Sequence, residues 1–220
     1  MNFNMSIKNK LQNIKLNLPK NITLVAVSKT KPVELLNEAY DQGQRIFGEN
    51  KVQEMVDKFE KMPKDIKWHM IGHLQTNKVK YIASFVSLIH GVDSLKLLRE
   101  INKQATKHNR VIDCLIQIKI ATEDTKFGMS LNDLQLLLKS DEFKTLDNIR
   151  IKGLMGMASF TTDNLQIESE FKYLKSIFDQ INKKHSDIEI LSMGMSNDYK
   201  LATKYGSNMV RIGSHIFGSR

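Results

Sequence analysis

One lysine is a candidate nucleophile. Lys29 is the first charged residue after ITLVAVS, a continuous β-type run that begins at Ile22. A lysine at the end of a buried strand loses hydration, which lowers its pKa and frees the amine to attack a carbonyl group. The same residue also fits a lysine that ends a strand and reaches into water. Covalent chemistry at Lys29 is therefore predicted only if other residues support it.

Two segments in the C-terminal part of the sequence resemble phosphate-binding turns. LSMGMSND places Gly194 and Ser196 after a strand-like run, ahead of a helix predicted over 197–204 that Ser196 would cap. MVRIGSHIFGS places Gly213 and Ser214 after another such run. Glycine lets the backbone approach an anion closely, and helix N-termini offer free N–H groups. Each turn, taken alone, also fits an ordinary tight turn or helix cap.

Strand-like and helix-like runs alternate along the chain. A leading helix carries Ile7, Leu11, Ile14 and Leu18 on one face, and Ser130 to Asp133 resemble a capping box. The predicted strands cover residues 22–29, 45–48, 67–71, 85–90, 111–120, 149–155, 189–192 and 209–212. This alternation is typical of a parallel sheet with helices on its outer face.

About eight such repeats in 220 residues predict an α/β fold, a single (β/α)8 TIM-type barrel with an extra N-terminal helix, forming one domain over residues 1–220. The rival is a doubly wound open sheet, whose usual GxGxxG turn the sequence lacks. In a closed barrel the last strand lies beside the first. A phosphate held by Ser196, Gly213 and Ser214 would then leave the rest of its ligand near Lys29.

A ligand with both an aldehyde and a phosphate fits this pair of features, and pyridoxal 5'-phosphate (PLP) is the common biological example. Arg211, on the last strand, would reach the pyridine nitrogen; as a permanent donor it would leave that nitrogen unprotonated. Its alternative is a buried structural ion pair. Asn50 would lie beside the ring, would cap the helix that follows, or would do both.

Composition narrows the classes of protein. The net charge of +9 attracts anions generally, but the lysines are scattered and aromatic residues make up only 7%, so surface lysine is favoured over a nucleic-acid site. No apolar run approaches the roughly 20 residues that cross a bilayer, and the N-terminus lacks a signal-peptide core, so we expect a cytoplasmic protein without a membrane partner. Cys114 is expected to be a buried thiol, and His69 and His73 lack a metal-site pattern.

Several ordered blocks of the sequence resemble the YggS-like pyridoxal phosphate homeostasis proteins, which are related to the N-terminal barrel of alanine racemase. The blocks are AVSKTKP (26–32), FGENKVQE (47–54), WHMIGHLQTNK (68–78), KFGM (126–129), KGLMGMA (152–158), LSMGMSND (191–198) and MVRIGSHIFG (209–218). His73 stands where the family pattern has proline, and Ser214 where threonine is usual.

The resemblance implies a fold type III barrel that carries PLP as a Schiff base on Lys29. It implies that Ser196, Gly213 and Ser214 bind the phosphate, that Arg211 faces the pyridine nitrogen and that Asn50 neighbours the cofactor. It further implies a monomer that manages the supply of PLP (vitamin B6) and amino-acid balance, with PLP-dependent apoenzymes as partners and no catalytic turnover. Racemases complete their site with a second domain and a tyrosine from a partner subunit, and we expect no such second domain here. A PLP-dependent amino-acid racemase is the alternative.

Overall fold

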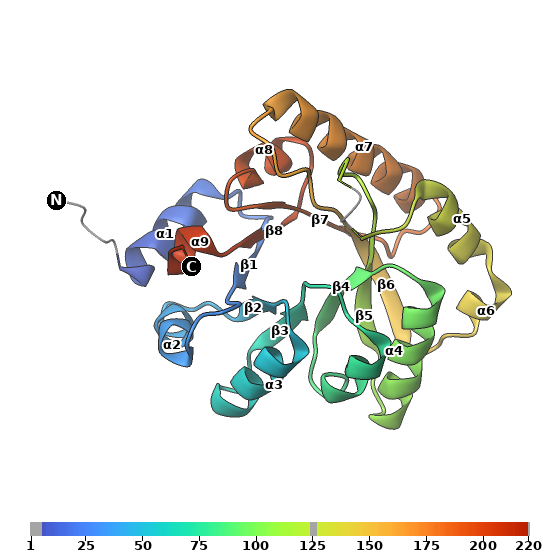
Figure 1. The fold of residues 1–220 in the computed structure, drawn as a ribbon, viewed down its shortest axis with the longest axis horizontal. Coiled ribbons are helices and arrows are strands. Elements are labelled where there is room, and N and C mark those ends of the chain that lie inside the picture. Colours follow the sequence, from blue (N-terminus) through green and yellow to red (C-terminus); the bar gives the residue numbers. More distant parts are fainter. Residues whose placement is uncertain (1–5, 124–126, 220) are drawn as a thin grey trace.

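Eight parallel strands close into a barrel, wound in chain order from β1 to β8 (Figure 1). The structure is a computed structural model that describes residues 6–123 and 127–219. The strands are β1 (Thr23–Val27), β2 (Ile46–Glu49), β3 (Lys67–Met70), β4 (Leu88–Val92), β5 (Ile112–Gln117), β6 (Ile149–Met155), β7 (Ile190–Met195) and β8 (Met209–Ile212). Pairing of β1 with β8 confirms the predicted barrel and excludes the open sheet.

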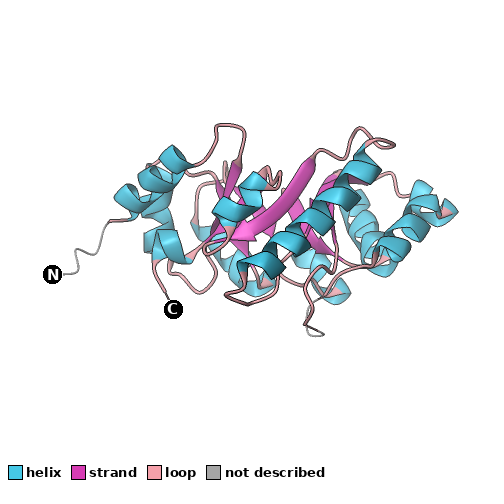
Figure 2. Cartoon of the chain, turned by 90° about the horizontal axis from the view of Figure 1, so that it is seen from above, coloured by secondary structure: helices cyan, strands magenta, loops and turns pink. Residues whose placement is uncertain are grey.

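Helices surround the barrel (Figure 2). They are α1 (Ile7–Asn17), α2 (Val33–Asp41), α3 (Val52–Lys61), α4 (Leu95–Lys107), α5 (Leu131–Lys139), α6 (Asp141–Lys144), α7 (Asn164–Asn182), α8 (Tyr199–Lys204) and α9 (Ser214–Phe217). A 3-10 helix, η1 (Thr76–Tyr81), connects β3 to β4 in place of an α-helix. The extra N-terminal helix α1 packs against α2 and α9. The capping box predicted at Ser130 is confirmed at the start of α5.

Alternating side chains of the strands divide the core into two parts. The barrel interior holds a small apolar cluster of Val25, Ile71, Leu88, Leu115, Met155 and Met209, against which Val27 packs. The intervening residues point outward and join the larger core between the barrel and its helices, for example Phe47 and Trp68. Lys29 comes two residues after Val27, in the same alternation as the inward side chains of β1.

Two sequence expectations about the rest of the chain can be compared with the structure. Cys114 lies on β5, is fully buried, and burial raises the pKa of its thiol, as expected for a packing residue. None of the helices in the described segments has both the length and the apolar character needed to cross a bilayer.

Candidate functional site

The seam formed by β7, β8 and β1 brings the predicted site residues together. Arg211 of β8 is in register with Val25 of β1 on one side and with Met195 of β7 on the other. Lys29 follows β1, and Ser196 follows β7. Because the strands are parallel, these residues meet at the C-terminal mouth of the barrel, where this fold carries its ligands.

The two predicted phosphate turns are in direct contact. The backbone N–H of Gly213 donates to Ser196 Oγ at 3.2 Å. A Cβ atom on Gly213 would lie 3.0 Å from the carbonyl oxygen of Val27, so the turn packs against the end of β1, two residues before Lys29. Ser214 is exposed and begins α9. Two small turns and the lysine-bearing strand end therefore form one continuous surface.

The expectation that Ser196 caps the following helix is wrong. Helix α8 begins at Tyr199 rather than at residue 197, and Asp198 occupies its N-cap position. The Asp198 carboxylate instead accepts a hydrogen bond from the backbone N–H of Met195, which closes the turn before the helix starts. Burial raises the pKa of the Asp198 carboxyl. The hydroxyl oxygen of Ser196 accepts a hydrogen bond from the backbone N–H of Gly213 instead.

Asn50 lies on the other side of β1. It follows β2, which pairs with β1, and it is half-buried. Its alternative role as a helix cap is wrong, because Lys51 occupies the N-cap position of α3. The backbone of Asn50 is packed against Gly72, where an added Cβ would lie 2.5 Å from the Asn50 carbonyl oxygen. The six predicted residues thus come from the ends of four adjacent strands.

Arg211 is buried and held by uncharged oxygens. Its Nη1 donates to the carbonyl oxygen of Ser192 at 2.9 Å and to Ser192 Oγ at 2.6 Å, and its Nη2 donates to the carbonyl oxygen of Gly156 at 3.0 Å. These bonds do not fit the ion-pair alternative. Burial lowers the pKa of the guanidinium to about 10, partly offset by Asp198, so Arg211 stays charged at neutral pH.

A chain of buried hydrogen bonds continues from Arg211 across the barrel interior, and the sequence did not predict it. Ser192 Oγ lies 3.2 Å from His90 Nδ1, and His90 Nε2 lies 3.1 Å from His69 Nδ1. Arginine can only donate, so Ser192 Oγ accepts from it and still has its own hydrogen for a second partner. The tautomer of each histidine decides which atom donates in the contacts of Ser192 with His90 and of His90 with His69.

Both histidines of this chain are neutral. Burial lowers the pKa of His69 to about 3, with a smaller effect of Lys67. Burial, followed by the charges of His69 and Arg211, holds the pKa of His90 well below its usual value. The signal that could have revealed them was their position in the sequence, because His69 and His90 each lie two residues from an apolar residue of the barrel interior, Ile71 and Leu88 respectively.

In the sequence, His69 and His73 stand out only as a possible pair of metal ligands. In the structure they make different contacts: His69 lies against His90 in the barrel interior, whereas His73, in the loop after β3, lies 3.3 Å from Asp93 through Nδ1 and stacks on Phe127 with ring centroids 4.3 Å apart. Among the residues that the structure describes, no three histidine, cysteine, aspartate or glutamate side chains are grouped as metal ligands would be. Lys126, part of a block that carries the resemblance, lies outside the described residues.

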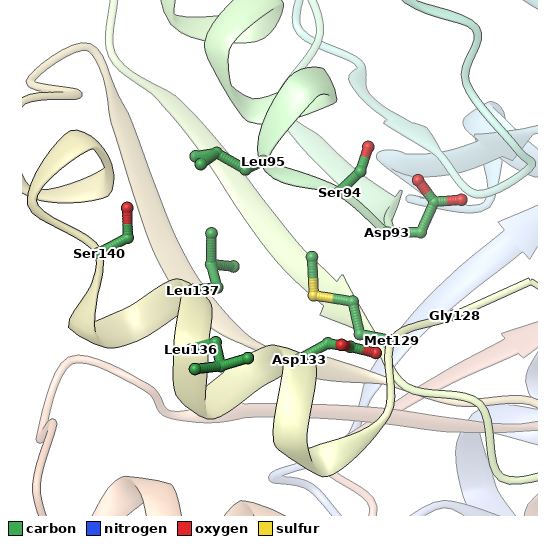
Figure 3. A pocket seen from close by; sticks show the side chains of 9 residues that line it. All are labelled: Asp93, Ser94, Leu95, Gly128, Met129, Asp133, Leu136, Leu137 and Ser140. Atoms are coloured by element: carbon green, nitrogen blue, oxygen red, sulfur yellow. The ribbon is translucent and has the colours of Figure 1, made fainter.

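A separate hollow lies between the N-terminal end of α4 and helix α5 (Figure 3). It is lined by Asp93, Ser94, Leu95, Gly128, Met129, Asp133, Leu136, Leu137 and Ser140. None of the six predicted site residues lines it. Its polar groups already serve local structure: Ser94 caps α4, and Asp133 bonds to Ser130 in the capping box of α5. This hollow therefore adds nothing to the candidate site.

Comparison with known proteins identifies the class. The family model described as "Alanine racemase, N-terminal domain" matches residues 5–220. Alanine racemase from Clostridium difficile superposes with a TM-score of 0.79 at 17% identity, over 98% of this chain and 56% of that chain, and so shares the fold. The fold and the arrangement of the mouth define a barrel of the alanine racemase N-terminal class.

Closer relatives define the family within that class. The chain is 41% identical over 204 residues to the pyridoxal phosphate homeostasis protein of Schizosaccharomyces pombe, covering 91% of this chain and 85% of the relative. It is 38% identical over 199 residues to the protein of that name from Aquifex aeolicus, covering 90% and 86%. The chain belongs to the pyridoxal phosphate homeostasis protein family. PipY of Synechococcus elongatus with PLP bound superposes with a TM-score of 0.86 at 30% identity, over 97% of this chain and all of that chain.

Proposed function

We propose that this chain binds PLP as a Schiff base on Lys29 and serves PLP homeostasis rather than catalytic turnover. The observation that carries the proposal is the seam: the strand end bearing Lys29 packs against the turn at Gly213, which is hydrogen-bonded to Ser196. Condensation of a neutral amine with an aldehyde forms a C=N bond and releases one water. It requires the amine and the anchored aldehyde to lie on one surface.

The phosphate end of PLP fits the two turns. Ser196 and Ser214 supply hydroxyl groups, and Gly213 supplies a backbone N–H with no side chain in front of it. In this arrangement the phosphate takes the N–H of Gly213 as a donor in place of the present internal hydrogen bond. The solved relative PipY, with PLP bound, supports the assignment of PLP as the ligand.

The ring end fits Arg211 and Asn50. Three uncharged oxygens orient the Arg211 guanidinium, and further N–H groups remain for the pyridine nitrogen. A charged donor at that nitrogen keeps it unprotonated, which weakens the ring as an electron sink. Such a site favours holding the cofactor over stabilising a carbanion, in keeping with a homeostasis role. Asn50 lies beside the ring.

In this role the protein works in the cytoplasm as a monomer and manages the supply of PLP to PLP-dependent apoenzymes, with consequences for amino-acid balance. The names of its relatives support the homeostasis role. In this role the protein binds neither a nucleic acid nor a membrane. The net charge of +9 is instead carried by scattered lysines that attract small anions.

The test is an absorbance spectrum of the purified protein with PLP, before and after borohydride, followed by peptide mapping of the reduced adduct. We expect an imine band, a stable adduct on Lys29, and loss of both in Lys29→Ala. Lys107→Ala is the matched control, since Lys107 is an exposed lysine at the C-terminal end of α4, away from the mouth. An adduct on another lysine, or none, contradicts the proposal.

A PLP-dependent amino-acid racemase is the second candidate, because the matching family model is that of the alanine racemase N-terminal domain. Incubation of the PLP-loaded protein with single amino-acid enantiomers, followed by chiral chromatography, distinguishes the two functions. Interconversion above the rate with free PLP favours the racemase. Its absence favours the homeostasis protein.

A further inference from the structure

Helix α3 is tied to the peptide groups on both sides of Lys29. The carbonyl oxygen of Ser28 accepts a hydrogen bond from Lys58 Nζ at 2.7 Å. The backbone N–H of Thr30 donates to Glu54 Oε1 at 2.5 Å. The residue between these two contacts is Lys29, so its peptide planes are fixed from the helix rather than from the strand alone.

The two contacts belong to one buried network. Lys58 Nζ donates to the Ser28 carbonyl oxygen, to Glu49 Oε1 at 2.8 Å and to Glu54 Oε1 at 2.7 Å, which uses all three hydrogens of an ammonium group. The side chains of Lys58 and Glu49 are 5% and 0% exposed. Ser28 Oγ also donates to Glu49 Oε1. Because Lys58 and Glu49 are shielded from water and each bonds to more than one partner, these contacts hold the segment around Lys29 in one geometry.

The backbone at this point is strained, and the network contains an unsatisfied atom. Thr30 has a φ of 63°, a left-handed conformation that a β-branched residue avoids. Glu49 Oε2 is buried without a hydrogen-bond partner, and burial raises the pKa of this carboxyl. Strain of this kind persists only where the surrounding structure enforces it, and it clusters at functional sites. A lysine that simply ended a strand in water would need none of these features.

We propose that Glu54 and Lys58 are positioning residues for Lys29. They orient the Ser28 and Thr30 peptides so that the Lys29 amine is presented to the aldehyde of PLP at the barrel mouth. This inference rests on the proposed function and deepens it. The residues touch neither ring nor phosphate; they act through the backbone, so they govern how fast the C=N bond forms rather than how tightly the ligand is held.

The experiment separates these two quantities. Imine formation is followed by stopped-flow absorbance after PLP is added to PLP-free protein. Affinity is measured with 4'-deoxypyridoxine 5'-phosphate, which keeps the ring and phosphate but has a methyl group in place of the aldehyde. We expect Glu54→Ala to slow imine formation at least about tenfold while analogue affinity stays within about twofold of wild type.

Two further variants sharpen the result. Glu54→Gln keeps an oxygen that accepts from Thr30 and Lys58, so it should recover a rate within about threefold of wild type. Glu60→Ala is the matched control, because Glu60 is an exposed glutamate of the same helix, and it should leave both quantities unchanged. If Glu54→Ala does not fold, Glu54→Asp decides instead, since it keeps the charge but withdraws the oxygen by one methylene.

Three outcomes are distinguishable. Wild-type imine rates in Glu54→Ala, or in Glu54→Asp where that variant decides, overturn the positioning role and leave the proposed function intact. Equal losses of imine rate and analogue affinity also overturn it, because they indicate a general defect of the mouth. A wild-type protein that forms no borohydride-reducible adduct on Lys29 overturns the proposed function itself.

Discussion

Replacing Ser192 by alanine tests the buried chain beneath the barrel mouth. The hydroxyl accepts from Arg211 Nη1 at 2.6 Å and contacts His90 Nδ1 at 3.2 Å, and Ser192 is fully buried. Loss of a hydrogen bond to a charged group costs roughly 1.5–3 kcal/mol. Arg211 keeps two other acceptors, the carbonyl oxygens of Ser192 and Gly156, which places the cost near the lower end.

The substitution also leaves His90 Nδ1 buried without its hydrogen-bond partner, which adds about 1 kcal/mol or more. The two contributions together predict a loss of about 3 kcal/mol in the free energy of unfolding. Urea denaturation followed by circular dichroism measures it, with an unchanged slope showing that the native state is as compact as before.

Ser176→Ala is the matched control. Ser176 is exposed on α7, and its hydroxyl donates only to the carbonyl oxygen of Tyr173. We expect the control to stay within about 0.5 kcal/mol of wild type. If Ser192→Ala were as mild as this control, the chain from Arg211 to the histidines would not be a stabilising network.

Two more predictions concern stability. In the folded state the pKa values of His69 and His90 lie below the value of roughly 6.5 that histidine has in an unfolded chain. As the pH falls, the unfolded state therefore binds protons first. The free energy of unfolding should fall from about pH 6.5 downward, by roughly 1.4 kcal/mol per pH unit for each histidine. Urea titrations at about pH 7 and pH 5 check this, and equal stabilities contradict it. Gly194→Ala should lower the free energy of unfolding by about 3 kcal/mol, because Gly194 has a φ of +94° and the new Cβ would lie 2.6 Å from the Cβ of Ala202. Gly43→Ala is the control: Gly43 has a φ of +80° but nothing within 4 Å of the added Cβ, so this variant should lose only about 1 kcal/mol. Thermal unfolding of both variants compares the two, and equal losses would show that packing at Gly194 is unimportant.

The fold could be predicted because each strand repeats the same physical signal. Continuous apolar runs bounded by turns indicate buried parallel strands, and the predicted ranges 149–155 and 209–212 agree with β6 and β8. Strand ends were less accurate: the fourth strand was predicted at 85–90 and lies at Leu88–Val92. Apolar residues in the preceding loop, such as Val86, are also buried, so hydrophobicity alone does not mark the boundary.

The candidate site was predictable only at the level of strand ends. Strand order and parallel direction suffice to bring Lys29, Ser196 and Gly213 to one mouth. The partners of individual polar groups were not predictable, because they depend on turn geometry: Asp198 rather than Ser196 serves the turn before α8. The contacts of Glu54 and Lys58 with the segment around Lys29 were not predictable either, because charged residues on a helix are normally solvated.

The pairing of β1 with β8 joins segments farther apart in sequence than any other strand pair of the barrel. Bringing such distant segments together carries the largest loop-closure entropy, so this junction is the costliest part of the fold to assemble. A small molecule that contacts both of these strands favours the closed form by mass action. On the proposed function, bound PLP would therefore stabilise this junction, and the folded fraction of the chain would rise with the concentration of PLP.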